Sequence, residues 1–119
     1  MSQTLTAGDY LVFQLESGYG LLRILAAEGE HTDRVWHLSV YEELFPDVES
    51  AEQALARPES LHASKQHVAL TSRAFERTPA ARLGYRDLSE AELAAFRQWQ
   101  HSTDRHVSDR SLLLLLGMR

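Results

Sequence analysis

The chain has 119 residues, 44% of them hydrophobic and 24% charged, as is typical of one globular domain. It has no cysteine, which excludes a disulfide framework, a thiolate metal site and a cysteine nucleophile. The longest apolar run, residues 112–116, is far shorter than the about 20 residues that a membrane-spanning helix needs. The first six residues have neither the basic nor the apolar segment of a signal peptide, so we expect a cytoplasmic protein.

The formal charge of −5 is unevenly distributed along the chain. Residues 1–60 contain eleven acids and three bases, a net charge of −8, whereas residues 61–119 contain six acids and nine bases, a net charge of +3. Residues 28–59 alone sum to −7. An acidic surface does not suit phosphate contacts, and it favours a partner protein with a basic surface. A solvated surface that keeps the protein in solution explains the same pattern.

The first two predicted elements form a β-hairpin. Residues 9–15 (DYLVFQL) alternate between the two faces of a strand, and residues 19–27 (YGLLRILAA) are again typical of a strand. The turn signal at residues 16–18 lies between them. We expect Gly18 to adopt a positive φ and Gly20 to mark a bulge or a close approach of the backbone.

A third strand is predicted over residues 34–41 (RVWHLSVY), after a polar turn at residues 28–32. Both of its faces are largely apolar, so we expect it to be covered on both sides. The segment 42–47 (EELFPD) is expected to end this strand. Three sequential strands joined by short turns indicate an antiparallel meander.

The middle of the chain contains shorter elements. Ser50 and Gln53 match a capping box, which predicts a helix over residues 51–56. Short strands are expected at residues 60–63 and 67–71, followed by one helical turn within residues 71–77. Residues 81–88 fit either an edge strand or an extended connection.

The clearest helix begins after Ser89, where Ser89 and Glu92 form a full capping box. Leu93, Phe96 and Trp99 then form an apolar stripe, and the helix should end near residue 102. The last element is predicted as a short helix over residues 108–116.

For this last helix, Ser108 is the expected N-cap and Gly117 the residue that ends it. The predicted fold class is therefore α+β in a single domain of residues 1–119. A small, mostly antiparallel, curled sheet or partial barrel (residues 7–71) carries two or three helices, packed on it from the C-terminal half (residues 89–117).

No recognisable catalytic, metal or cofactor motif is present. The chain lacks a GxSxG nucleophile motif, a glycine-rich phosphate loop and an HExxH zinc motif. Its six histidines include two pairs spaced five residues apart, which a helix would place about 140° from each other. We therefore predict no metal, no cofactor and no enzymatic activity. His37 lies in an apolar strand and is expected to be a buried, hydrogen-bonded histidine.

A cluster of four arginines surrounds Phe75 and Tyr85 in the second half. Arginines interleaved with aromatic residues can bind single-stranded nucleic acid, and ordinary surface ion pairs explain the same pattern. A nucleic-acid-associated small β-barrel protein is therefore kept as the alternative function. Its candidate contacts are Arg73, Arg77, Arg82 and Arg86.

The first part of the chain resembles a known family. Gly8-Asp9-Tyr10 opens a strand, residues 16–20 (ESGYG) turn it and residues 21–25 (LLRIL) run back, as in the bacterial immunity protein 26 family. The segment 40–46 (VYEELFP) is similar to a strand exit in related bacterial proteins. The resemblance covers residues 7–46. It implies a small β-barrel domain that is not an enzyme and that neutralises a cognate toxin by binding it.

This resemblance, taken with the charge asymmetry, predicts a protein-binding module with a basic protein partner. The candidate contacts are the acidic residues Glu42, Glu43, Asp47, Glu49 and Glu52. Tyr41 and Phe45 are candidate apolar anchors, and core packing is the competing interpretation of these two residues.

Overall fold

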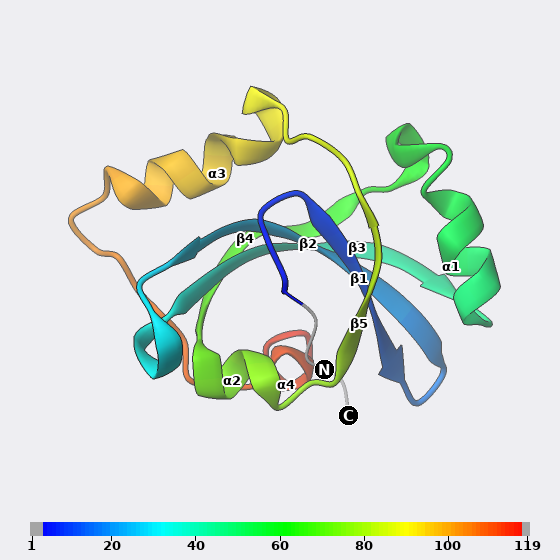
Figure 1. The fold of residues 1–119 in the computed structure, drawn as a ribbon, viewed down its shortest axis with the longest axis horizontal. Helices are drawn as coiled ribbons and strands as arrows, with labels where there is room; N and C mark the ends of the chain where they lie inside the picture. Colours follow the sequence, from blue (N-terminus) through cyan, green and yellow to red (C-terminus); the bar gives the residue numbers. More distant parts are fainter. Residues whose placement is uncertain (1–3, 118–119) are drawn as a thin grey trace.

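One curled, open sheet of five antiparallel strands organises the protein (Figure 1). The computed structural model describes residues 4–117, apart from the side chain of His31. The strand order is β4-β3-β2-β1-β5. The strands are β1 (Asp9–Leu15), β2 (Gly18–Glu28), β3 (Val35–Phe45), β4 (Ala63–Thr71) and β5 (Ala80–Tyr85). This arrangement confirms the predicted α+β class and the antiparallel meander. Residues 81–88 were expected to form either an edge strand or an extended connection, and the edge strand β5 is what forms there.

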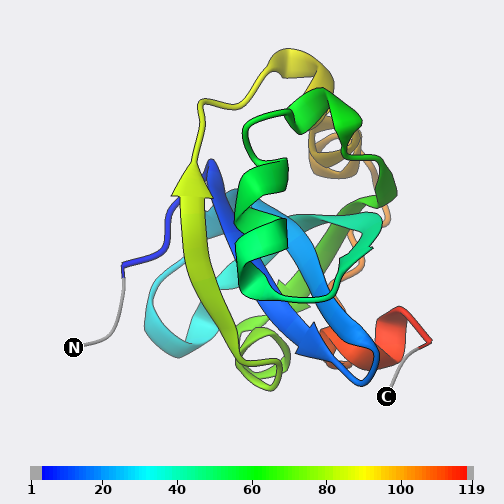
Figure 2. The same ribbon diagram turned by 90° about the vertical axis from the view of Figure 1, so that its right-hand side faces the viewer.

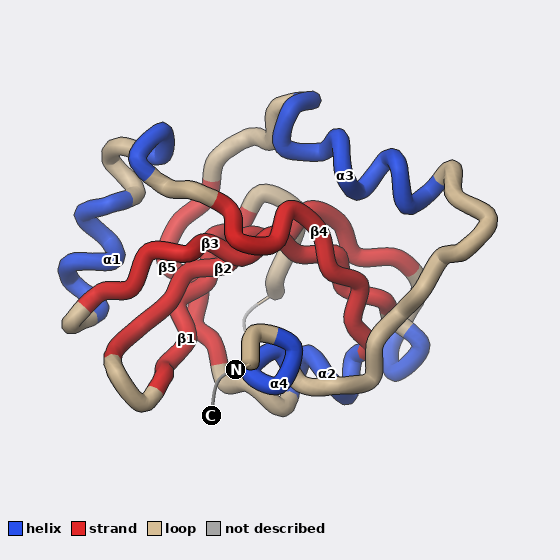
Figure 3. Tube along the Cα trace, turned by 180° about the vertical axis from the view of Figure 1, so that it is seen from behind, coloured by secondary structure: helices blue, strands red, loops and turns tan. Residues whose placement is uncertain are grey.

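Helices cover both faces of the sheet. They are α1 (Val48–Ala54), α2 (Ser72–Glu76), α3 (Glu90–Gln100) and α4 (Leu112–Leu115), with short 3-10 helices η1 (His31–Asp33) and η2 (Pro58–Ser60). Figure 1 shows α1 and α3 on one side of the sheet and α2 and α4 on the other, and Figure 3 shows the same layers from behind. The expected division into a β-rich first half and a helical second half is only approximate, because α1 precedes β4 and β5 follows α2.

Two apolar clusters fill these layers. The cluster on the side of α2 and α4 contains Phe13, Leu38 and Leu112, and the cluster on the side of α1 contains Tyr10 and Leu21. Alternate residues of one strand thus enter different clusters, as the two-residue period of a strand requires. The expectation that the third strand is covered on both sides is confirmed, since every residue from 36 to 40 is buried.

The hairpin glycines have the two roles that were expected of them. Gly18 has a φ of +149°, and a Cβ on it would lie 2.5 Å from the carbonyl oxygen of Phe45. A Cβ on Gly20 would lie 2.7 Å from the ring of Phe13. Both contacts are closer than van der Waals packing allows, so the β1–β2 hairpin requires glycine at each position.

Two predicted boundaries near the acidic segment are wrong. The third strand continues to Phe45, which pairs with Tyr19 of β2, and does not end at residue 41. Helix α1 starts earlier than predicted, because Asp47 and not Ser50 is its N-cap. The Asp47 side chain accepts a hydrogen bond from the backbone N–H of Ser50 at 2.7 Å.

Two further boundaries differ for similar reasons. Residues 58–60 form η2, and β4 begins only at Ala63, so the separate short strand expected at residues 60–63 is absent. Ser108 does not cap the last helix, because it forms a parallel bridge with Leu70 of β4. Helix α4 begins after Ser111, and Gly117 has the positive φ of +71° expected of a helix-ending glycine.

A buried arginine connects the sheet to the start of α3. Arg23 of β2 is 1% exposed, and its guanidinium lies 4.3 Å from the centre of the Tyr10 ring. It forms an ion pair with Glu92 in the first turn of α3. Glu92 also accepts a hydrogen bond from the backbone N–H of Ser89, which confirms the predicted capping box. One carboxylate therefore both caps α3 and neutralises the buried cation.

The remaining donors of Arg23 bind main-chain oxygens. Its Nε donates to the carbonyl of Gly8 at 3.4 Å, and its Nη2 donates to the carbonyls of Arg86 and Asp87, the latter at 3.2 Å. Figure 2 shows β5 running beside β1, with the segment that contains residues 86 and 87 rising from its end toward α3. Arg23 thus ties this connection to the sheet.

We expect Arg23→Met to lower the free energy of unfolding by about 3–5 kcal/mol, because it leaves Glu92 and several carbonyl groups without their buried partner. Arg57→Met is the matched control, since Arg57 is exposed, and its effect should stay within about 0.5 kcal/mol. Urea denaturation monitored by circular dichroism measures both. Equal stability of the two variants would contradict the structural role of Arg23.

Candidate functional site

The predicted acidic contacts lie on one continuous segment, from the end of β3 into α1 (Figure 1). Glu43 is half-buried and the other four acids are exposed. Glu42, Glu49 and Glu52 form no ion pair with any residue between 4 and 117. We name Glu42, Glu43, Asp47, Glu49 and Glu52 the acidic surface.

The two candidate aromatic anchors are partly withdrawn from this surface. Tyr41 and Phe45 are half-buried and pack against the cluster on the side of α1. The large apolar side chains exposed within the segment are Leu44, 46% exposed, and Val48, 40% exposed. Sequence reasoning missed both residues because it ended the strand at residue 41. A strand extended to Phe45 alternates Tyr41, Glu43 and Phe45 with Glu42 and Leu44.

Two members of the acidic surface also have structural roles. Glu43 accepts hydrogen bonds from the backbone N–H and the ring Nδ1 of His62, both at 2.8 Å. Partial burial opposes ionisation of Glu43, but these hydrogen bonds outweigh it and lower its pKa. The bond to Glu43 raises the pKa of His62. The backbone N–H of Ser50 lowers the pKa of Asp47 in the same way.

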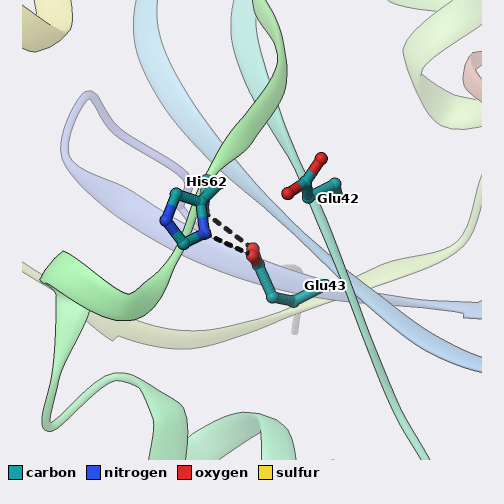
Figure 4. Close-up of side chains that lie close together, drawn as sticks. All are labelled: Glu42, Glu43 and His62. Atoms are coloured by element: carbon teal, nitrogen blue, oxygen red, sulfur yellow. Dashed lines mark hydrogen bonds and ion pairs between the residues drawn. The ribbon is translucent and has the colours of Figure 1, made fainter.

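Glu42, Glu43 and His62 also form a group of potential metal ligands (Figure 4). One ligand atom from each lies within 4.8 Å of the others. Both carboxylate oxygens of Glu43 already accept hydrogen bonds from His62, one from its backbone N–H and one from its ring Nδ1, as the dashed lines in Figure 4 show. A cation would have to replace these bonds. The spacing of histidines along the chain could not reveal this group, because it forms across β3 and the segment that leads into β4.

A second buried polar group lies where α3 crosses β3 and β4. His37 of β3 is 0% exposed, and its Nε2 lies 2.6 Å from Oε1 of Glu28. A carboxylate only accepts, so Nε2 of His37 carries the hydrogen and its Nδ1 accepts from Nε2 of His67, 2.9 Å away. This confirms the predicted buried and hydrogen-bonded His37. Its partners could not be predicted, because they lie on two other strands.

The apolar stripe of α3 packs on these two imidazoles. The ring of His37 lies 4.5 Å from the ring of Phe96 and 4.7 Å from that of Trp99, centre to centre. Burial lowers the pKa of His67 to about 4, and the nearby His37 contributes to this shift. Burial also lowers the pKa of His37, against the opposing effect of Glu28. Both shifts favour the neutral form of the imidazole.

A concave site with a volume of about 400 Å³ lies between α3, η2 and the sheet. Tyr10, Ser39 and Tyr41 of the strands line it, together with Leu61 after η2 and Ala95 of α3. We name this site the α3 pocket. Its lining residues come from segments that are distant in the sequence, so no local sequence motif could predict it.

The four arginines proposed for nucleic-acid binding are divided among different environments. Arg73 donates to both carboxylate oxygens of Asp109, and Arg77 donates to the main-chain oxygen of Asp109 at 3.1 Å. Arg82 donates to the buried carboxylate of Asp9 at 2.8 Å. Arg86 lines the α3 pocket. Three of the four thus take part in contacts within the protein.

No helix formed by residues 4–117 is long and apolar enough to cross a membrane.

Comparison with known proteins supplies no relative. A scan against protein-family models finds no match, and neither a search of curated proteins nor a search of solved structures finds a significant one.

The histidine pair predicts that acid weakens the fold. In the unfolded chain, His67 is protonated below its ordinary pKa of 6.5. In the folded chain, the same side chain is protonated only below about pH 4. The free energy of unfolding should therefore fall by about 3 kcal/mol as the pH drops across this interval. Thermal unfolding followed over this pH range measures the effect.

His67→Gln should reduce this pH dependence, because glutamine stays neutral throughout, and the lowered pKa of His37 should account for part of what remains. His101→Gln is the control, since His101 is exposed at the end of α3, and it should retain the wild-type slope. A wild-type slope in His67→Gln would show that the pair does not cause the acid sensitivity.

Proposed function

We propose that the chain is a non-enzymatic protein-binding module whose partner is a basic protein. The supporting observation is one continuous chain segment, from the end of β3 into α1, in which three carboxylates without ion pairs, those of Glu42, Glu49 and Glu52, accompany the exposed Leu44 and Val48. Exposed apolar side chains bordered by charge are a common composition of protein interfaces.

The two kinds of side chain make different contributions to such an interface. Unpaired carboxylates accelerate encounter with a basic partner and exclude acidic ones. Leu44 and Val48 supply apolar area that leaves water on binding, which slows dissociation. The acids at positions 43 and 47 add to the negative potential while they hold the local structure.

Toxin immunity in the bacterial cytoplasm is the specific form of this function that we propose. The resemblance of residues 7–46 to the immunity protein 26 family supports it, and so does the acidic surface, because nuclease toxins have basic clefts for their substrates. An immunity protein would act by occupying that cleft, and it needs no catalytic group of its own.

Nucleic-acid binding through the arginine-rich second half remains the alternative proposal. It requires a basic face with free side chains. Arg73 and Arg77 are engaged by Asp109, and Arg82 by Asp9, so the observed contacts favour the acidic surface.

Charge reversal tests the proposed function. The triple variant Glu42→Lys, Glu49→Lys and Glu52→Lys changes only acids without ion pairs, so it should fold normally. The tagged chain should retain a basic protein from nuclease-treated lysate of its native host, and the triple variant should retain at least about tenfold less. Mass spectrometry identifies and quantifies the retained protein.

The matched control reverses three other exposed acids, at Glu16, Glu30 and Glu76, which changes the net charge equally. It should retain the partner as the wild type does. If both triple variants lose the same amount of retained partner, net charge alone explains the effect and the acidic surface is not the binding site. Release of the partner by nuclease would favour the nucleic-acid alternative.

Leu44→Ser and Val48→Ser test the apolar part of the surface. Both side chains are largely exposed, so each change should leave the free energy of unfolding within about 0.5 kcal/mol of the wild type. Each should weaken partner binding about three- to tenfold, mainly by faster dissociation. Surface plasmon resonance with the captured partner measures this, and unchanged dissociation rates would remove both residues from the interface.

A further inference from the structure

The α3 pocket contains hydroxyl groups that the protein itself does not use. Tyr10 and Ser39 are 2% and 8% exposed, and both line the pocket. Neither side-chain hydroxyl hydrogen-bonds to any group between residues 4 and 117, and neither is sealed off from the pocket space. Both hydroxyls therefore keep free hydrogen-bonding capacity that faces the pocket, and a ligand there can take the place of water as their partner.

Two charged side chains of opposite sign on the pocket wall are also unpaired. Arg86, after β5, and Glu59, in η2, form no ion pair within the described chain. The other two charges of the pocket, Arg23 and Glu92, neutralise each other. The wall therefore offers one free cation and one free anion, with no net charge.

Most of the remaining wall is apolar, and Gln66 adds a polar amide. Pro58 and Leu61 line the pocket on the side of η2, and Ala91 and Ala95 line it on the side of α3. The small alanine side chains leave space that a larger residue would fill. Burial raises the pKa of Tyr41 to about 12, so its hydroxyl keeps its proton and can donate. The volume of about 400 Å³ lies in the range of small-molecule sites.

We propose that the α3 pocket binds a small zwitterion, namely a free amino acid with an apolar side chain. Its carboxylate pairs with Arg86, its ammonium group with Glu59, and its side chain lies against the apolar wall. The hydroxyls of Tyr10 and Ser39 then bind the ligand in place of water. The inference is independent of the proposed function, because the pocket shares only Tyr41 with the candidate partner contacts.

Titration of the ¹⁵N-labelled full chain, followed by NMR, tests this assignment. The probes are L-leucine and L-phenylalanine, each up to about 10 mM, a concentration that reveals even millimolar affinity. Saturable shifts should appear at the amides of pocket residues. Phenethylamine lacks the carboxylate and 3-phenylpropionate lacks the ammonium group, so each should bind at least about tenfold more weakly than L-phenylalanine.

Two variants of α3 locate the site. Ala95→Leu fills the pocket and should abolish the shifts. Ala94→Leu is the matched control, because Ala94 is exposed on the same helix and does not line the pocket, and it should bind as the wild type does. Tyr10→Phe and Ser39→Ala remove one hydroxyl each and should weaken binding about three- to tenfold.

Three results would each overturn the proposal. The first is the absence of saturable shifts with both amino acids. The second is equal affinity for L-phenylalanine and either singly charged analogue, which would show that Arg86 and Glu59 do not both bind the ligand. The third is unchanged binding by a folded Ala95→Leu variant, which would place the ligand elsewhere.

Discussion

Burying a guanidinium is costly unless its nitrogen atoms have hydrogen-bond acceptors, and Arg23 imposes this requirement on the centre of the sheet. The surrounding structure meets it by bringing three separated segments together. Gly8 precedes β1, residues 86 and 87 follow β5, and Glu92 begins α3. The position of α3 over the sheet follows from this single buried charge.

Helix α3 is held to the sheet by an ion pair at its start and by aromatic ring contacts towards its end. At its start, Arg23 and Glu92 form an ion pair, and both residues line the α3 pocket. Further along, Phe96 and Trp99 rest on His37 and His67. The acidic surface lies outside this arrangement, at the end of β3 and on α1, so a protein partner and a small ligand would occupy different parts of the molecule.

Local sequence patterns predicted the features that depend on neighbouring residues. The Ser89–Glu92 capping box, the Gly18–Gly20 turn and the alternating strands each lie within a few residues, and all are confirmed. Asp47 and Ser50 are both good N-cap residues only three positions apart, so local pattern could not choose between them. The pairing of Arg23 with Glu92 spans 69 residues and the pocket spans more segments still, and no local pattern carries such information.

The way in which Arg23 holds the 86–87 connection has a consequence for how this protein can evolve. Arg23 donates hydrogen bonds to main-chain carbonyl oxygens, which every amino acid possesses. The side chain at position 86 takes no part in these bonds and lines the pocket. Mutations at that position can therefore alter which molecules the pocket accepts while the anchor remains intact. Stability and selectivity are separable there, and related chains could diversify their ligands at this position with little cost to folding.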